Sequence, residues 1–191
     1  MTGPRPAEPH PPGSLRIDSF ALARNGQRLP GTTPIAQLAR LAASLQPTPE
    51  APLGALDWSL AGSVGPDPRG VPSEWIDLAA DFAAPMRCMR CLETVVLPIA
   101  ARRRFRLERD ERAVEAEPLD EDAFDLLLGS PRLDALALVE DEALLALPLS
   151  PRHERCALPG EAPGQPAKAA ERPHPFAALA ALRRPGAAGG D

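Results

Sequence analysis

The sequence predicts an α+β domain in which an antiparallel β-sheet is flanked by two helices and is followed by a flexible C-terminal tail ending in a short helix. Between residues 55 and 112, apolar residues alternate with polar ones, which is typical of strands with one buried face. The segments 33–46 and 131–147 instead place apolar residues at helical spacing. A length of 191 residues suits one domain with tails.

The N-terminal part divides into a tail and a short helix. Residues 1–13 contain five prolines, so we expect a disordered lead-in. The stretch LRIDSFALA that follows is compatible with a first strand, although its alternation is weak. The stretch GTTPIAQLARLAASLQP predicts an amphipathic helix over 33–46, capped by Thr33, with Pro34 in its first turn.

Two strands come next in the predicted sheet. Leu56, Trp58 and Leu60 alternate with polar residues, and the same period of two runs from Ile76 to Ala84. The stretch GSVGPDPRG between them is rich in turn-forming residues. This arrangement predicts two antiparallel strands joined by a turn.

A third strand carries a basic face. In LETVVLPIAARRRFRLER, Arg102, Arg104 and Arg106 share one parity, and six apolar residues share the other: Val95, Leu97, Ile99, Ala101, Phe105 and Leu107. Arg103 interrupts the apolar parity, and Pro98 has no N–H to give to a neighbouring strand. We therefore expect this strand to lie near a sheet edge or to contain a bulge.

The helix over 131–147 closes the predicted domain, with Ser130 as a candidate cap. Its acidic residues Glu140, Asp141 and Glu142 are consecutive, so their carboxylates point in different directions around the helix. We expect them to form a solvated face rather than a catalytic pair or a magnesium site.

Composition excludes several classes of protein. The net charge of −5 does not favour contact with nucleic acid over the whole surface, so any RNA contact must be local. Three cysteines argue against a disulfide framework and suit a reducing compartment. We find no signal peptide, membrane span, nucleotide-binding glycine motif, HExxH or nucleophile elbow, and expect a soluble cytoplasmic protein without enzymatic activity.

Two pairs of residues have metal-ligand spacing. Cys88 and Cys91 form a CxxC between two strands, and His153 and Cys156 repeat that spacing after the 131–147 helix. Together they make a candidate Cys3His zinc site. The alternative is that the cysteines are small residues at a turn. A thioredoxin-like redox centre fits poorly, because a strand and not a helix follows the motif.

An arginine cluster is the second candidate site. Alternate positions on one strand face lie about 6.6 Å apart, close to the phosphate spacing of a nucleic-acid strand. The candidate RNA-binding residues are Arg87, Arg90, Arg102, Arg104 and Arg106. The alternative is that they pair with the acidic segment 108–125. Tyr is absent and Phe105 points to the apolar side, so base stacking of the RRM or OB type is not supported.

Three motifs in series resemble the bacterial YceD family of large ribosomal RNA subunit accumulation proteins. CMRCLETV resembles the family's CxRC turn, LDALALVEDEALLALPLSPRHERC is similar to its helix with the following histidine and cysteine, and HPFAALAALRR is similar to its closing NPFAxLxxLK segment. His174 stands where that segment usually has Asn. The resemblance covers roughly residues 55–156 and 174–184.

The resemblance implies a non-enzymatic factor needed for the synthesis, processing or stability of 23S rRNA, with precursor rRNA or the maturing large subunit as partner. It also favours zinc at the Cys3His positions. Protein-only adaptor function, presenting a ribosomal protein or a processing nuclease, is the alternative, and a metal-dependent or redox regulator is a third hypothesis.

The resemblance also suggests boundaries for the chain. We predict a YceD-like domain over 14–156, a linker over 157–173 and a docking segment over 174–191. In that last segment Phe176, Leu179 and Leu182 recur every three residues, as in helices that bind a groove of a partner protein.

Overall fold

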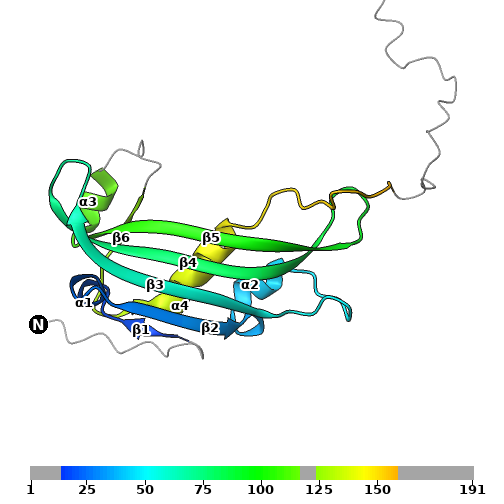
Figure 1. Cartoon of the computed structure of the whole chain (residues 1–191), viewed down its shortest axis with the longest axis horizontal. Helices are drawn as coiled ribbons and strands as arrows, with labels where there is room; N and C mark the ends of the chain where they lie inside the picture. The colour runs from blue at the N-terminus through cyan, green and yellow to red at the C-terminus, as the bar shows by residue number, and fades with distance from the viewer. Residues whose placement is uncertain (1–13, 117–123, 159–191) are drawn as a thin grey trace, which may run out of the picture.

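A five-stranded sheet with the strand order β2-β3-β4-β5-β6 dominates the computed structural model, which describes residues 14–116 and 124–158 (Figure 1). The strands are β2 (Arg28–Pro34), β3 (Ala55–Pro66), β4 (Pro72–Arg87), β5 (Thr94–Glu108) and β6 (Asp125–Leu128). Strands β2 to β5 are antiparallel neighbours, and β6 runs parallel to β5. The predicted α+β class is confirmed, with a mostly antiparallel sheet.

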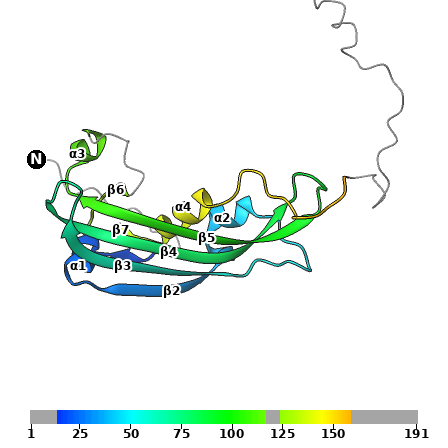
Figure 2. The same cartoon turned by 45° about the horizontal axis from the view of Figure 1, so that its top comes forward.

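The helices are short, and most of them pack on one face of this sheet. They are α1 (Ser19–Arg24), the 3₁₀ helix η1 (Ile35–Gln37), α2 (Ala39–Ser44), α3 (Glu111–Ala116) and α4 (Ala135–Leu145). Helix α4 crosses diagonally behind the long strands, and α2 lies beside it (Figures 1 and 2). Strands β1 (Arg16–Ile17) and β7 (Leu133–Asp134) form a separate two-stranded pair that leads into α1 and α4.

The core lies between the helices and the inner face of the sheet. Because side chains alternate across a strand, the apolar parity read from the sequence faces the helices: Leu56 and Leu60 of β3 are fully buried, and so is Ile76 of β4. Leu41 of α2 and Val139 of α4 meet them from the other side. The two strands predicted from alternation are therefore confirmed, and both extend beyond the predicted residues.

Strand β5 lies near the sheet edge, as predicted. It pairs with β4 in an uninterrupted register from Trp75 opposite Arg106 to Arg87 opposite Thr94, so this ladder contains no bulge. On its other side, β6 pairs only with the stretch from Phe105 to Glu108. Among the residues that the structure describes, no strand pairs with the preceding part of β5 on this side.

Helix α1 lies directly on β3 because Gly62 has no side chain. A Cβ at this position would come within 2.2 Å of the backbone oxygen of Leu22. Backbone atoms cannot move aside cheaply, so any larger residue would push the helix away from the strand.

The prediction for the N-terminal region is wrong in two places. The LRIDSFALA stretch is mainly helix α1, whose N-cap is Asp18, and only two of its residues are in a strand. The helix predicted over 33–46 is preceded by strand β2, which continues to Pro34. Thr33 does not cap a helix, because its hydroxyl accepts a hydrogen bond from Nε1 of Trp58 at 3.0 Å. Helix α2 begins later, at Ala39.

Helix α4 is shorter than the predicted 131–147 because its N-cap is Asp134, whose side chain accepts from the N–H of Ala137. The same pattern, Arg-[Ile/Leu]-Asp-x-x-Ala-Leu, leads into both α1 and α4. In each copy a two-residue strand leads into an aspartate cap, and the two strands pair antiparallel.

Several predictions fall on residues that the structure does not describe. The lead-in 1–13, the docking segment 174–191 and the linker beyond Leu158 all lie outside the described residues. Within the described residues, no helix is long and apolar enough to cross a membrane.

Candidate metal centre

The tip of the β4–β5 hairpin is a tight turn built around Cys88. The N–H of Cys88 donates to the carbonyl of Glu93 at 2.9 Å, and the N–H of Leu92 donates to the carbonyl of Cys88 at 3.0 Å. The N–H of Arg90 points at Sγ of Cys88, 3.4 Å away. These bonds fold the CxxC so that both of its sulfur atoms lie on one side of the turn.

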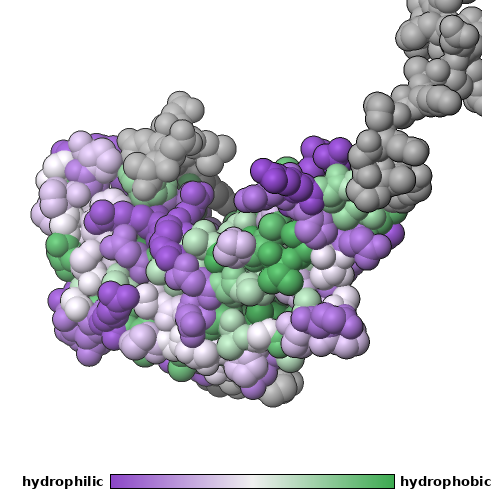
Figure 3. Space-filling view, turned by 45° about the vertical axis from the view of Figure 1, so that its right-hand side comes forward, coloured by the Kyte–Doolittle hydropathy of each residue, from purple (hydrophilic) through white to green (hydrophobic). Residues whose placement is uncertain are grey.

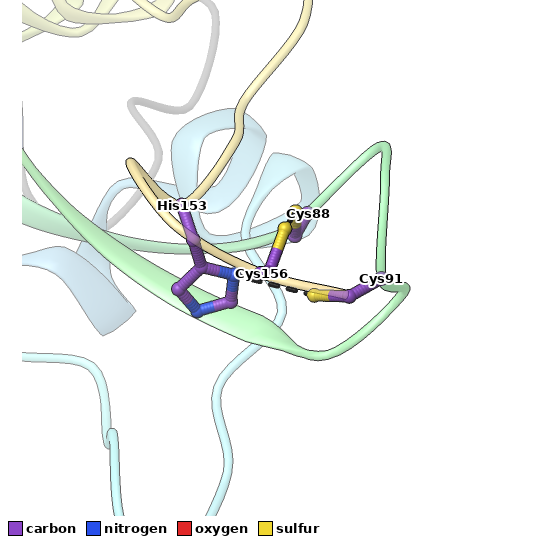
Figure 4. A group of neighbouring side chains, drawn as sticks. All are labelled: Cys88, Cys91, His153 and Cys156. Atoms are coloured by element: carbon purple, nitrogen blue, oxygen red, sulfur yellow. Dashed lines mark hydrogen bonds between the residues drawn. The ribbon is translucent and has the colours of Figure 1, made fainter. Parts of the chain in front are cut away.

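The second pair of candidate ligands arrives on the segment after α4. This segment runs alongside the hairpin tip, where the N–H of Met89 donates to the carbonyl of Pro151 at 2.8 Å. Figure 4 shows the result: His153 and Cys156 point toward Cys88 and Cys91 from the facing segment. One ligand atom of each of the four residues lies within 4.8 Å of the others.

Two pairs of ligand atoms are about as far apart as ligands of a tetrahedral site. Sγ of Cys88 and Sγ of Cys156 are 3.8 Å apart, which is too long for a disulfide. Two thiolates bound to one zinc at about 2.3 Å, with a tetrahedral angle between them, would be separated by roughly 3.8 Å. Sγ of Cys91 lies 3.3 Å from Nδ1 of His153. The four side chains are therefore already spaced as ligands.

The environment favours a thiolate at Cys88. Burial opposes ionisation of this thiol, but hydrogen bonds from the backbone N–H groups of Cys91, His153 and Arg90 outweigh it, and the pKa of Cys88 falls to about 5. At Cys156 burial raises the pKa, and hydrogen bonds and charge from Cys88 and Cys91 raise it further. A cation that neutralises the cluster would reverse this repulsion between neighbouring thiolates.

The donor set fits zinc. Three sulfurs and one imidazole nitrogen are soft or borderline donors, which zinc prefers over the oxygen donors typical of magnesium or calcium. Four protein ligands would fill a tetrahedral shell and leave no position for water or substrate, which is the pattern of structural zinc sites. Because one pair of ligands comes from the β4–β5 hairpin and the other follows α4, such a metal would tie these two segments together.

The arginines of β5 are engaged in ion pairs across the outer face of the sheet. Arg102 binds both carboxylate oxygens of Asp81 at 2.7 and 2.8 Å, and Arg104 lies 3.6 Å from a carboxylate oxygen of Asp77. Their main partners are thus aspartates of β4. The acidic segment 108–125 proposed as the alternative partner contributes Asp125, which pairs with Arg103, and Glu108, which pairs with Arg106.

The expectation that Arg106 shares an exposed basic face with Arg102 and Arg104 is wrong. Its side chain is only 6 % exposed and pairs with Asp67 at 3.4 Å and Glu108 at 3.0 Å. The guanidinium also lies over the ring of Phe124. Because side chains alternate along β5, Arg106 lies on the outer face of the strand with Arg102 and Arg104, as predicted. However, Asp67 and Phe124, which are not part of β5, cover the outer face at the end where Arg106 lies.

Arg87 and Arg90 lie in a different place from the β5 arginines, on the hairpin tip beside Cys88. Both are exposed. The docking residues Phe176, Leu179 and Leu182 lie outside the described residues.

Sequence reading missed the role of Glu140. It was expected on a solvated face, yet Glu140 is buried and accepts hydrogen bonds from the backbone N–H groups of Arg40 and Leu41. The signal that could have revealed it is its spacing, because Glu140 lies four residues after Leu136 and three before Ala143, on the apolar face of the helix.

The family model described as large ribosomal RNA subunit accumulation protein YceD matches residues 76–183, which include all four candidate metal ligands. No solved structure matches the chain.

Proposed function

Because the chain belongs to the YceD family of large ribosomal RNA subunit accumulation proteins, we propose that it acts without catalysis in the cytoplasm, where it supports the synthesis, processing or stability of 23S rRNA. The family implies a role in the accumulation of large-subunit rRNA and has no known catalytic activity. The observation that carries the proposal is the family match across the residues that build the Cys3His cluster.

In this proposal the Cys3His cluster holds a structural zinc ion. A bound zinc would supply a crosslink between the β4–β5 hairpin and the segment after α4. The residues that bind it would be Cys88, Cys91, His153 and Cys156. The hairpin would then be a rigid projection at one end of the sheet, suited to contact with a large partner.

The partner that we propose is precursor 23S rRNA or the pre-large-subunit particle, contacted directly through arginine side chains of the β4–β5 hairpin. Two sets of arginines are candidates: Arg102 and Arg104 on the outer face of β5, and Arg87 and Arg90 at the tip. We further propose that Phe176, Leu179 and Leu182 dock onto a protein of the same particle. The main alternative is an adaptor that binds only proteins.

Depletion of the protein in growing cells tests the function. We expect the ratio of 23S to 16S rRNA to fall, with free small subunits accumulating in sucrose gradients, and wild-type protein to restore the ratio. Unchanged 23S rRNA and a normal subunit profile would contradict the proposal and would favour the hypothesis of a metal-dependent or redox regulator.

A further inference from the structure

The two segments that carry the Cys3His cluster expose six side chains, which together we call the knuckle surface. Its members are Arg87, Met89, Arg90, Leu92, Arg152 and Arg155. The first four belong to the hairpin turn and the last two to the segment that carries His153 and Cys156. The hydrogen bond from Met89 to Pro151 and the convergence of the four ligands hold these two segments together.

The arginines of the knuckle surface differ from those of β5 in their partners. Arg102, Arg103 and Arg104 each pair with an aspartate, so an incoming phosphate would meet a carboxylate beside every one of them. Among residues 14–116 and 124–158, no carboxylate forms an ion pair with any of the four knuckle arginines, which are Arg87, Arg90, Arg152 and Arg155.

The charge of the knuckle surface is consequently available to an anionic partner. Nε of Arg87 donates to the carbonyl of Leu92 at 3.3 Å, which steadies the turn without neutralising the guanidinium. The same two segments carry two exposed acidic side chains, Glu93 and Glu154, and a Cys3His cluster with zinc bound would add one formal negative charge, so the four arginines leave one net positive charge. The excess of positive charge favours phosphate groups even though the whole chain is acidic.

Two large apolar side chains lie exposed among these arginines. Met89 is 60 % exposed and Leu92 is 49 % exposed. Leu92 has φ 68°, a left-handed conformation that is uncommon for a non-glycine residue and that is held here by the turn hydrogen bonds. Figure 3 shows hydrophobic residues gathered on the half of the molecule that carries the hairpin tip, with hydrophilic residues at their borders.

This combination fits single-stranded RNA. Unpaired bases can stack on guanidinium planes and pack on apolar side chains while their phosphates pair with arginines, whereas a duplex hides its base faces and offers mainly phosphates. We propose that the knuckle surface is the part of this protein that binds single-stranded segments of precursor rRNA. This inference rests on the proposed function and assigns its RNA contact to the hairpin tip rather than to the β5 face.

Fluorescence anisotropy with the zinc-loaded full chain tests the inference. The probe is a labelled 12-nucleotide RNA of mixed sequence, used as a single strand and annealed to its complement. Arg90→Ala/Arg155→Ala is compared with Arg102→Ala/Arg104→Ala, because each variant removes two positive charges. A third variant, Met89→Ser, tests the apolar contact.

We expect the Arg90/Arg155 variant to bind the single strand at least tenfold more weakly than wild type. The slope of the logarithm of its binding constant against the logarithm of the salt concentration should become shallower by about 1.4, because two phosphate contacts are lost. The Arg102/Arg104 variant should lose less than threefold, Met89→Ser about threefold to tenfold, and the duplex should bind at least tenfold more weakly than the single strand. Equal losses for the two arginine pairs, or equal binding of duplex and single strand, would overturn the inference.

The same variants in cells separate failure of this inference from failure of the proposed function. If the chain binds no RNA but Arg90→Ala/Arg155→Ala still lowers 23S rRNA, the knuckle surface binds a protein, so the inference fails while the function stands. If depletion of the protein leaves 23S rRNA unchanged, the proposed function itself fails.

Discussion

Glu140 of α4 caps the neighbouring helix α2 through its contact with Arg40. Oε1 of Glu140 accepts from the backbone N–H of Arg40 at 2.8 Å, and Oε2 accepts from the guanidinium of the same residue at 2.9 and 3.0 Å. Helix α2 has no side-chain cap of its own, because its N-cap residue is Leu38. The glutamate therefore satisfies N–H donors of α2 and joins the two helices that cover the sheet.

Replacement of this carboxylate should destabilise the domain. Glu140→Gln keeps the shape of the side chain but loses the negative charge that both helix N–H groups and the Arg40 guanidinium face. We expect a loss of roughly 2 kcal/mol in the free energy of unfolding, measured by urea denaturation. The control is Asp141→Asn, whose exposed pair with Arg40 should contribute less than about 1 kcal/mol. Equal losses of unfolding free energy in the two variants would contradict the role of Glu140 as the cap of α2.

Glu142 should show the opposite behaviour. Burial raises its pKa above the ordinary value of 4.5, with Asp125 and Asp141 adding to the rise and Arg103 opposing it. A raised pKa in the folded state means that the folded chain holds this proton more tightly than the unfolded chain does. The protonated form of Glu142 therefore favours the folded state at low pH. This contribution to the free energy of unfolding is lost as the pH rises from about 4.5 through the folded-state pKa.

Glu142→Gln should accordingly raise the Tm at pH 7 by a small amount, and this advantage should disappear as the pH approaches 4. The measurement is thermal denaturation followed by circular dichroism between pH 4 and pH 8. A variant that is less stable than wild type at pH 7 would show that Glu142 makes a favourable contact as an anion.

Two glycines of β3 provide a matched test of how α1 packs on the sheet. A Cβ at Gly62 would meet the backbone of Leu22, whereas a Cβ at Gly65 would meet nothing within 4 Å. Gly62→Ala should cost about 1–3 kcal/mol, since the helix must move away from the strand. Gly65→Ala should be neutral or slightly stabilising. Similar urea midpoints for the two variants would contradict the close approach.

The candidate metal centre makes the most direct chemical prediction. Purified protein should contain one zinc ion per chain by mass spectrometry of the metal, and Cys88→Ser should lose it together with part of its thermal stability. A strong chelator should lower the Tm of the wild type but not that of Cys88→Ser. Met89→Ser, which changes an exposed neighbour in the same turn, should keep the zinc. A metal-free wild type with unchanged stability after Cys88→Ser would remove the zinc proposal.

Much of the fold could be predicted from local patterns. Alternation identified β3, β4 and β5 because each has one buried face, and it also placed Phe105 correctly in the core. The convergence of the Cys3His residues followed from their spacing and from the family resemblance. These features depend on short stretches of sequence, which is why they could be recognised without coordinates.

The missed features depend on contacts between distant segments. Strand β2 was not foreseen because its hydrogen bonds are made with β3, and the hydroxyl of Thr33 is engaged by Trp58 instead of capping a helix. The burial of Arg106 comes from Asp67 and Phe124, which lie far from it in the chain. In each case a partner outside the local stretch decides which of two locally reasonable structures forms.

The central claim is that this protein contacts precursor 23S rRNA through the tip of its β4–β5 hairpin. The measurement that tests it most directly is ultraviolet crosslinking of the tagged protein in growing cells, with sequencing of the attached RNA, for wild type and for Arg90→Ala/Arg155→Ala. We predict enrichment of precursor 23S sequences that falls at least tenfold in the variant, while the protein level is unchanged. An absence of crosslinked rRNA from wild type, in cells whose large subunits still fall on depletion, would contradict the claim and would show that the protein acts through another protein.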